Sequence, residues 1–169
     1  YRDKGGVKQA LKKQYISKSN IAEIIEEAKR LWKIDLPKVK KMLSIELDKG
    51  YLLISDDIKM VKMNIDNKYT LLPFLADKEL LAKFPSIEVD MGAVKAVCNG
   101  ASIMRPGIVS MEQFSKDDVV CIKDEKHKQY LAVGIALMDS KEAEGLEKGL
   151  VIKNLHYIGD KFWEAYKEV

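Results

Sequence analysis

The chain has 169 residues, of which 47% are hydrophobic and 33% are charged, and its formal net charge at pH 7 is +3. A chain of this length buries one ordinary core or two small ones, and so many charged residues argue against a membrane protein. Neither a run of about 18 apolar residues nor the apolar core of a signal peptide is found. We therefore expect a globular, cytoplasmic protein with no membrane partner.

The charge is divided unevenly along the chain. Residues 1–76 hold 16 Lys and Arg against 10 Asp and Glu, a balance of +6, and residues 77–169 hold 13 against 16, a balance of −3. The cations of the first 18 residues begin with Arg2, Lys4 and Lys8. This stretch is either a basic arm or a solvated extension with an edge strand near residues 14–16.

The first half is predicted to contain one helix and several antiparallel strands. Ser19-Asn20 is expected to cap the helix, with Glu23 completing a capping box. Alternating apolar residues predict strands at 42–47, 51–55, 58–65 and 68–72, with a hairpin turn at 48–50. Trp32 is expected to be buried. It shares one apolar face of the helix with Ile21, Ile24, Ile25, Ala28 and Leu31.

A short apolar bridge, residues 73–85, leads into a second unit of strands and turns. It lacks the composition of a free linker, so we expect the two halves to pack together, with Asp77 capping a short helix. A further capped turn of helix begins at Asp139-Ser140 and is closed by Gly149. Five short strands suit a small, partly closed barrel, and they are predicted at 87–90, 102–104, 119–123, 129–138 and 150–157.

The segment 89–109, VDMGAVKAVCNGASIMRPGIV, is spaced for a backbone surface and not for a catalytic pocket. A helix is predicted from Gly92 to Gly100, where a left-handed residue ends it, and Pro106-Gly107 predicts a later turn. On this helix Lys95 and Asn99 share one face. Its core-facing stripe is Val94, Val97, Cys98 and Ala101, and its nearly bare flank is Ala93, Ala96 and Gly100. The alternative is that Gly100 only stops the helix and the alanines only pack tightly.

The sequence carries few signs of catalysis or metal binding. His127 is expected in a solvated hairpin tip, and His156 is expected to be a structural residue that bonds a neighbouring carbonyl. Cys98 and Cys121 lack the spacing of a zinc or redox motif and are interpreted as reduced core residues. No phosphate loop, dinucleotide fingerprint or nucleophile elbow is present. We therefore predict no catalytic residue, no metal and no cofactor.

Several stretches of the second half resemble the PUA domain, an RNA-binding module named after pseudouridine synthases and archaeosine transglycosylases. They are the segment 89–109, DDVVCI at 117–122, YLAVGIALM at 130–138 and KGLVIKNLHYIGDKFW at 148–163. Through NGASIMRPGI and NLHYIGDKFW the chain looks most like the multiple-copies-in-T-cell-malignancy family, related to ligatin, and its archaeal members. The resemblance implies an α+β protein with a pre-PUA domain at 1–76 and a PUA pseudo-barrel at 77–169.

The resemblance also implies a non-enzymatic protein that binds structured RNA, either tRNA or rRNA, in translation initiation or ribosome function. Two alternatives stay open: an adaptor that binds a translation factor or the ribosome, and an accessory subunit of an RNA-modifying enzyme. The RNA-contacting residues that the family pattern implies are Lys95, Asn99, Gly100, Ala101, Arg105, Lys153, Asn154 and Tyr157.

Overall fold

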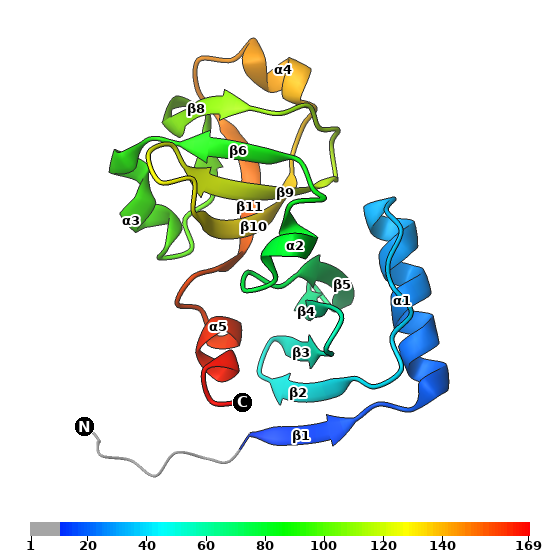
Figure 1. Cartoon of the computed structure of the whole chain (residues 1–169). Helices are drawn as coiled ribbons and strands as arrows, with labels where there is room; N and C mark the ends of the chain where they lie inside the picture. Colours follow the sequence, from blue (N-terminus) through cyan, green and yellow to red (C-terminus); the bar gives the residue numbers. More distant parts are fainter. Residues whose placement is uncertain (1–10) are drawn as a thin grey trace, which may run out of the picture.

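A computed structural model describes residues 11–169, which form two β-sheets joined by a short helical bridge (Figure 1). The first sheet holds five strands in sequence order, each antiparallel to its neighbours, so the predicted α+β class and strand pattern are confirmed. Residues 1–10, with Arg2, Lys4 and Lys8, lie outside the described residues, and the edge strand expected near residues 14–16 is β1. The strands are β1 Lys12–Tyr15, β2 Leu43–Leu47, β3 Gly50–Ile54, β4 Lys59–Ile65 and β5 Lys68–Pro73.

Helix α1, Lys18–Trp32, covers part of one face of the first sheet. Its N-cap is Ser17, whose Oγ accepts a hydrogen bond from Asn20 N at 3.3 Å, so the cap predicted at Ser19-Asn20 is wrong, and the helix begins before it. Ser17 has the extended backbone of a cap, and Asn20 already donates to it. Trp32 is buried as predicted, and its indole N–H donates to Leu71 O at 2.9 Å.

The bridge between the sheets contains helix α2, Lys78–Leu81, and is fixed at its start by one carboxylate. Asp77 Oδ1 accepts from Leu80 N at 3.1 Å, which confirms the predicted cap. Asp77 Oδ2 accepts from Lys59 N at 2.9 Å and so ties the bridge to β4.

The second sheet has six strands in the order β7-β11-β10-β9-β6-β8, in which only the β6–β9 pair is parallel. Short helices lie between them: η1 Met91–Ala93, α3 Val94–Val97, η2 Arg105–Gly107 and α4 Ser140–Glu144. Strand β8 was not predicted, and α4 ends at Gly145 instead of Gly149. The strands are β6 Ser86–Val89, β7 Ile103–Met104, β8 Ile108–Met111, β9 Val119–Asp124, β10 Tyr130–Ala136 and β11 Leu150–Tyr157.

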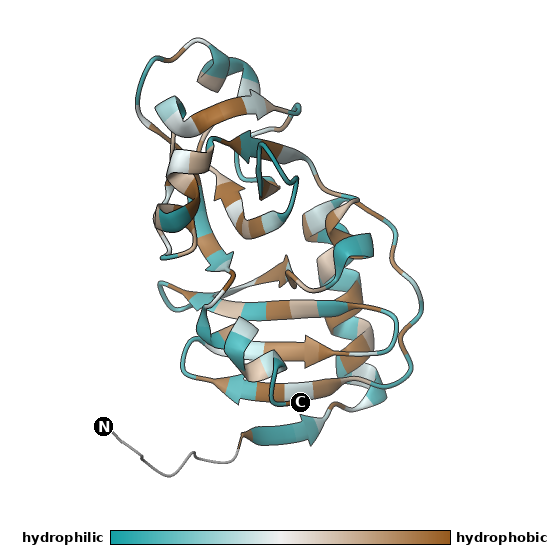
Figure 2. Cartoon of the chain, turned by 60° about the vertical axis from the view of Figure 1, so that its left-hand side comes forward, coloured by the Kyte–Doolittle hydropathy of each residue, from teal (hydrophilic) through white to brown (hydrophobic). Residues whose placement is uncertain are grey.

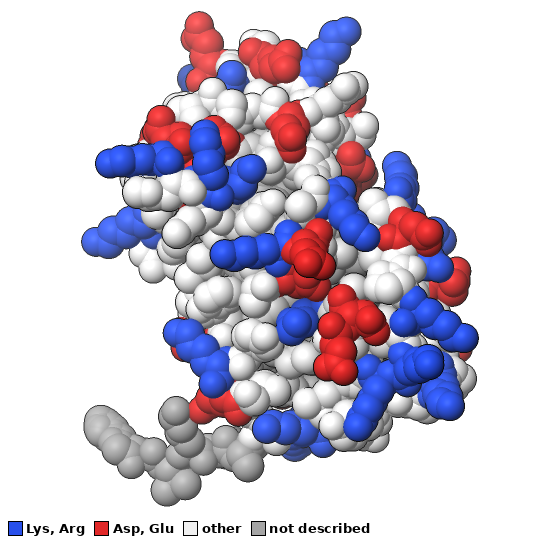
Figure 3. Space-filling view, viewed as in Figure 1, with Lys and Arg blue, Asp and Glu red and all other residues white. Residues whose placement is uncertain are grey.

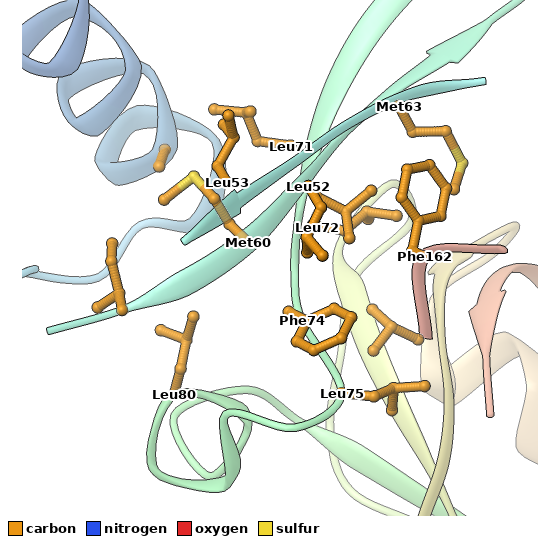
Figure 4. Close-up of a cluster of buried hydrophobic side chains, with 14 of the residues drawn as sticks. Leu52, Leu53, Met60, Met63, Leu71, Leu72, Phe74, Leu75, Leu80 and Phe162 are labelled. Atoms are coloured by element: carbon orange, nitrogen blue, oxygen red, sulfur yellow. The ribbon is translucent and has the colours of Figure 1, made fainter. Parts of the chain in front are cut away.

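The two sheets share a hydrophobic core, and the second sheet also has a core of its own that includes Ile87, Val97 and Ile152. Leu52 and Leu72 of the first sheet are fully buried and belong to the same cluster as Cys121 and Val133 of the second sheet. Figure 4 shows Phe74, from the bridge, among the leucines of this cluster. The prediction that the halves pack together is confirmed by this core, and the boundary between residues 76 and 77 stays a prediction.

The final helix, α5 Lys161–Tyr166, follows the second sheet in the chain but packs on the first. Phe162 and Ala165 are buried in the shared core, and Figure 2 shows α5 lying across the strands of the first sheet. The first sheet is therefore covered by α1 on one face and by α5 on the other.

A buried carboxylate organises the β9–β10 turn and makes its stability dependent on pH. Asp124 accepts hydrogen bonds from the backbone N–H groups of His127 and Gln129. Burial acts to raise the pKa of Asp124, but these hydrogen bonds prevail and hold the pKa below its ordinary value of 3.8. Because the folded pKa is lowered, the ionised group stabilises the fold above pH 3.8, and this contribution is lost as the pH falls through the folded pKa.

We expect Asp124→Asn to lower the free energy of unfolding by about 1–3 kcal/mol at pH 7, because an amide N–H₂ then faces a backbone donor. Urea unfolding at a series of pH values from 7 to 2 measures this effect. The difference in free energy of unfolding between the variant and the parent protein should become smaller as the pH falls. Asp56→Asn, at an exposed turn, is the control and should show no such trend. A difference that is constant with pH would contradict the assignment.

Candidate nucleic-acid interface

The segment predicted as one helix from Gly92 to Gly100 is instead two short pieces, η1 and α3. Asp90 Oδ1 caps η1 through Ala93 N at 2.9 Å. The chain then turns back early, because Asn99 N and Ala101 N both donate to Ala96 O. Gly100 has φ +92°, so its predicted role as a left-handed stop is confirmed.

The predicted core stripe of this segment is only partly correct. Val97 is buried, Val94 and Cys98 are half-buried, and Ala101 is exposed because the helix has already ended there. Of the predicted bare flank, Ala93 is half-buried and only Ala96 is fully open to solvent. Beside Ala96, Asn99 and Ala101 are exposed and Gly100 is half-buried. We call these four residues, Ala96 and 99–101, the Gly100 ledge.

Two residues of strand β11, Asn154 and Tyr157, contact the ledge. A Cβ at Gly100 would lie 3.0–3.2 Å from the ring of Tyr157, so the missing side chain lets this ring pack against the main chain. Asn154 Nδ2 donates to Val97 O and to Ala101 O, each at 3.0 Å. Its Oδ1 is buried with no partner among the described residues. Asn154 thus holds the end of α3 and keeps one acceptor unused.

Gly134 determines how β11 passes over β10. A Cβ at this position would lie 2.3 Å from Lys153 O, so only glycine allows the two strands to approach so closely. The pairing register shifts between Val133 and Gly134. On β11, Lys153 is exposed and its neighbour Asn154 is half-buried beneath the ledge.

Two residues of the ledge, Asn99 and Gly100, line a groove of about 620 Å³ between the two sheets, which we call the interdomain groove. Of the eight predicted residues, Asn99, Gly100, Lys153, Asn154 and Tyr157 line it. Lys95 is exposed on α3 but does not line the groove, and neither do Ala101 and Arg105. Residues that the sequence interpretation missed come from two hairpin turns of the first sheet, from β11 and from the start of α5: Leu47, Lys49, Met63, Asn64, Ile65, Asp66, Leu155, Asp160, Lys161 and Phe162.

The groove carries modest positive charge. Lys49 and Lys153 are exposed and form no ion pair with any residue that the structure describes. Lys161 Nζ lies 3.0 Å from Asp48 Oδ2, and because both side chains are largely exposed this pair adds little stability and is easily exchanged. Lys49 belongs to the basic half of the chain, so the first unit supplies charge that the second unit lacks.

His156 has a structural role beneath the groove. It is fully buried, its Nε2 accepts from Leu75 N at 3.1 Å, and its Nδ1 lies 2.7 Å from Asp160 Oδ2. Nδ1 therefore carries the proton and the imidazole is neutral. The predicted carbonyl partner was wrong, because the ring bonds a backbone N–H and a carboxylate. Its ring stacks on Phe74 with centroids 5.2 Å apart.

None of the His and Cys side chains that the structure describes lines the interdomain groove. The described residues contain no group of three or more His, Cys, Asp or Glu arranged to hold a metal ion. Burial raises the pKa of Cys121 to about 12, so this thiol is no nucleophile at neutral pH. His127 is exposed at the β9–β10 turn, as predicted. None of the helices between residues 11 and 169 has the length and hydropathy needed to cross a membrane.

Arg105 lies outside the groove with its guanidinium already engaged. Its Nε donates to Ala143 O at 2.8 Å and its Nη1 to Ile108 O at 3.2 Å, so it joins η2 to α4 and to β8. These bonds engage two of the guanidinium N–H groups and hold the side chain against carbonyls of its own chain.

We expect Arg105→Ala to lower the free energy of unfolding by about 1–3 kcal/mol, since two carbonyls lose a charged donor. Affinity for tRNA should stay within about twofold, because the substitution removes no phosphate ligand. Urea unfolding and a mobility-shift titration measure the two effects. A tenfold fall in affinity without loss of stability would instead place Arg105 in the interface.

The second sheet with its short helices is a PUA domain: the family model described as the PUA domain matches residues 85–158. Two solved structures share the fold of almost the whole chain. A hypothetical protein of Pyrococcus horikoshii has a TM-score of 0.72 at 27% identity, with 90% of this chain and 98% of that chain covered. A PUA domain protein of Aeropyrum pernix, at 23% identity, has a TM-score of 0.77 over 94% of this chain and 92% of that chain.

Relatives are also found in sequence. The uncharacterized protein MJ1432 of Methanocaldococcus jannaschii is 38% identical over 161 residues, which cover 90% of this chain and 95% of that protein. Translation machinery-associated protein 20 of Schizosaccharomyces pombe is 28% identical, with 96% and 87% covered. Malignant T-cell-amplified sequence 1-A of Xenopus laevis is 38% identical, with 56% and 58% covered. The chain belongs to this family of PUA-domain proteins, as the resemblance in its sequence predicted.

Proposed function

We propose that this protein binds structured RNA, tRNA or rRNA, without transforming it, and that it does so in the cytoplasm as part of translation. Family membership supports RNA binding, and the name of one relative, translation machinery-associated protein 20, supports the link to translation. The chemistry agrees, because the buried His156 and Cys121 leave the described residues without an activated base or thiol.

The main support for the proposal is that residues predicted separately from the sequence lie together in the structure. Five residues chosen from the PUA pattern, from the turn after α3 and from β11, line a single open groove. At the Gly100 ledge the main chain is exposed, so an RNA backbone can lie against it. The exposed side chains of Lys153 and Lys49 can bind phosphates, and the Asn99 amide offers both hydrogen-bond donors and an acceptor.

The RNA is expected to be read mainly by shape. The groove offers few base-specific partners, whereas the shallow groove of an RNA helix displays 2′-hydroxyls and phosphates that a surface of amides and lysines can contact. Tyr157 adds a half-buried ring whose hydroxyl end lies beside the ledge. Lys95, exposed on α3 next to the ledge, extends the surface outward.

Crosslinking of the full chain to cellular RNA, with sequencing of the attached RNA and mass spectrometry of the attached peptides, tests this proposal. We expect tRNA or rRNA, attached within residues 95–101 and 153–157. Crosslinks confined to other surfaces would refute the site, and recovery of no RNA above background would favour the adaptor alternative.

A further inference from the structure

A second groove, of about 660 Å³, lies between α1 and the irregular segment that follows it. Its floor is apolar and buried, formed by Ile21, Ile25 and Leu36. Its rim is cationic, with Lys18, Lys38 and Lys40 all exposed. We call it the α1 groove.

The rim has a surplus of positive charge. Lys29 is the one rim lysine held by acids within the described chain, with its Nζ 3.6 Å from Glu26 and 3.7 Å from Asp35. Lys18, Lys38 and Lys40 form no ion pair with any described residue. Residues 11–41 contain nine Lys and Arg against four Asp and Glu. Figure 3 shows Lys and Arg gathered at the lower right, where α1 and its following segment lie.

The main chain beside the groove is also available. Residues 37–41 belong to no helix or strand, and residues 38–41 donate no backbone hydrogen bond to the part of the chain that the structure describes. Their N–H groups, next to a lysine rim, can receive the carbonyls or carboxylates of an extended peptide.

The position and lining of the α1 groove separate it from the proposed RNA surface. In Figure 1, α3 and α5, which border the interdomain groove, lie to the left, and α1 lies to the right. No aromatic side chain lines the α1 groove, so it offers nothing on which a nucleobase can stack. Its buried aliphatic floor suits an aliphatic side chain instead.

From these features we infer that the α1 groove is a docking site for an acidic segment of a partner protein, with one or two aliphatic side chains seated on Ile21, Ile25 and Leu36. The carboxylates of that segment meet Lys18, Lys38 and Lys40. The protein then connects RNA, on one side, to a protein partner on the other.

The test uses the full chain and labelled peptides of twelve residues. The first peptide consists of Asp, Glu and Ser with two central leucines. One companion replaces the leucines by Ser, and another replaces the acids by Asn and Gln. Fluorescence anisotropy gives affinities, and amide chemical shifts locate the peptide. We expect the first peptide to bind best, with shifts at residues 18–25 and 36–41.

The matched variants are Lys18→Glu/Lys38→Glu/Lys40→Glu and, with the same change of net charge, Lys116→Glu/Lys126→Glu/Lys141→Glu on exposed sites of the PUA domain. The first should weaken peptide binding at least about tenfold and the second less than about twofold. Binding of tRNA by the α1-groove variant should change less than its peptide binding, which also shows that it is folded.

Three results would overturn the inference. They are equal peptide affinity for both variants, equal affinity for all three peptides, and a single-stranded RNA of twelve nucleotides that shifts residues 36–41 and loses its binding in the α1-groove variant. The last result would assign the groove to nucleic acid.

Discussion

Reversing the charges of Lys49 and Lys153 together should weaken tRNA binding by about 10- to 100-fold near 0.1 M salt, because attraction to two phosphates becomes repulsion. The two side chains come from different sheets and face one groove. Each lysine–phosphate pair that is lost should also make the slope of log affinity against log salt concentration less steep by about 0.9. The double variant should therefore show a slope that is smaller by about two.

The measurement is a filter-binding or mobility-shift titration between about 50 and 300 mM salt, a range in which the screening of exposed charges changes strongly. Lys116→Glu with Lys126→Glu is the control, since both lysines are exposed and neither lines the groove. This control changes the net charge by the same amount as the groove variant. A difference between the two variants therefore reports the position of the lysines and not the long-range attraction of RNA to the whole protein. If both double variants lost affinity alike, the groove would have no special role.

His156→Ala should lower the free energy of unfolding by about 3–5 kcal/mol, the largest effect that we expect from any single substitution. The substitution empties a fully buried site that stacks on Phe74. It also leaves the N–H of Leu75 without a partner and removes one of the donors to the carboxylate of Asp160, which still accepts from the backbone N–H groups of Tyr157 and Trp163. Because Leu75 lies in the bridge and His156 in β11, the damage falls on the junction between the sheets.

Urea unfolding at neutral pH measures this effect, and His127→Ala is the control. That residue is exposed in a turn, so its removal should change stability by no more than about 0.5 kcal/mol. His156→Gln, which retains a polar side chain of similar length, should recover part of the stability. A change below about 1 kcal/mol for His156→Ala would show that the buried hydrogen bonds contribute little.

The sequence was sufficient for most of the fold, because periodicity is a local property. The alternating residues of β4 and the apolar stripe of α1 predicted their elements to within a few residues. Errors occurred where several local signals compete. Ser17, Ser19 and Asn20 are all good caps, and only the path of the chain from β1 selects Ser17. β8 was missed because its four residues alternate poorly.

The candidate site was predictable only in part, because hydrogen-bond partners distant in sequence leave no local trace. Arg105 has the chemistry of a phosphate ligand, yet Ala143, 38 residues away, occupies it. Asn154 similarly binds main chain more than 50 residues away. Lys49 was predicted to lie in a hairpin turn, but its place opposite Lys153 follows from how the sheets dock.

The return of α5 to the first sheet makes the PUA domain an insertion, entered and left through the same neighbouring unit. A cut after residue 76 separates the first sheet from Phe162 and Ala165 and exposes apolar surface on both fragments. The two halves should consequently unfold in one transition, and activities measured on either fragment alone describe a damaged molecule. Functional dissection of this protein is better done by point substitution than by truncation.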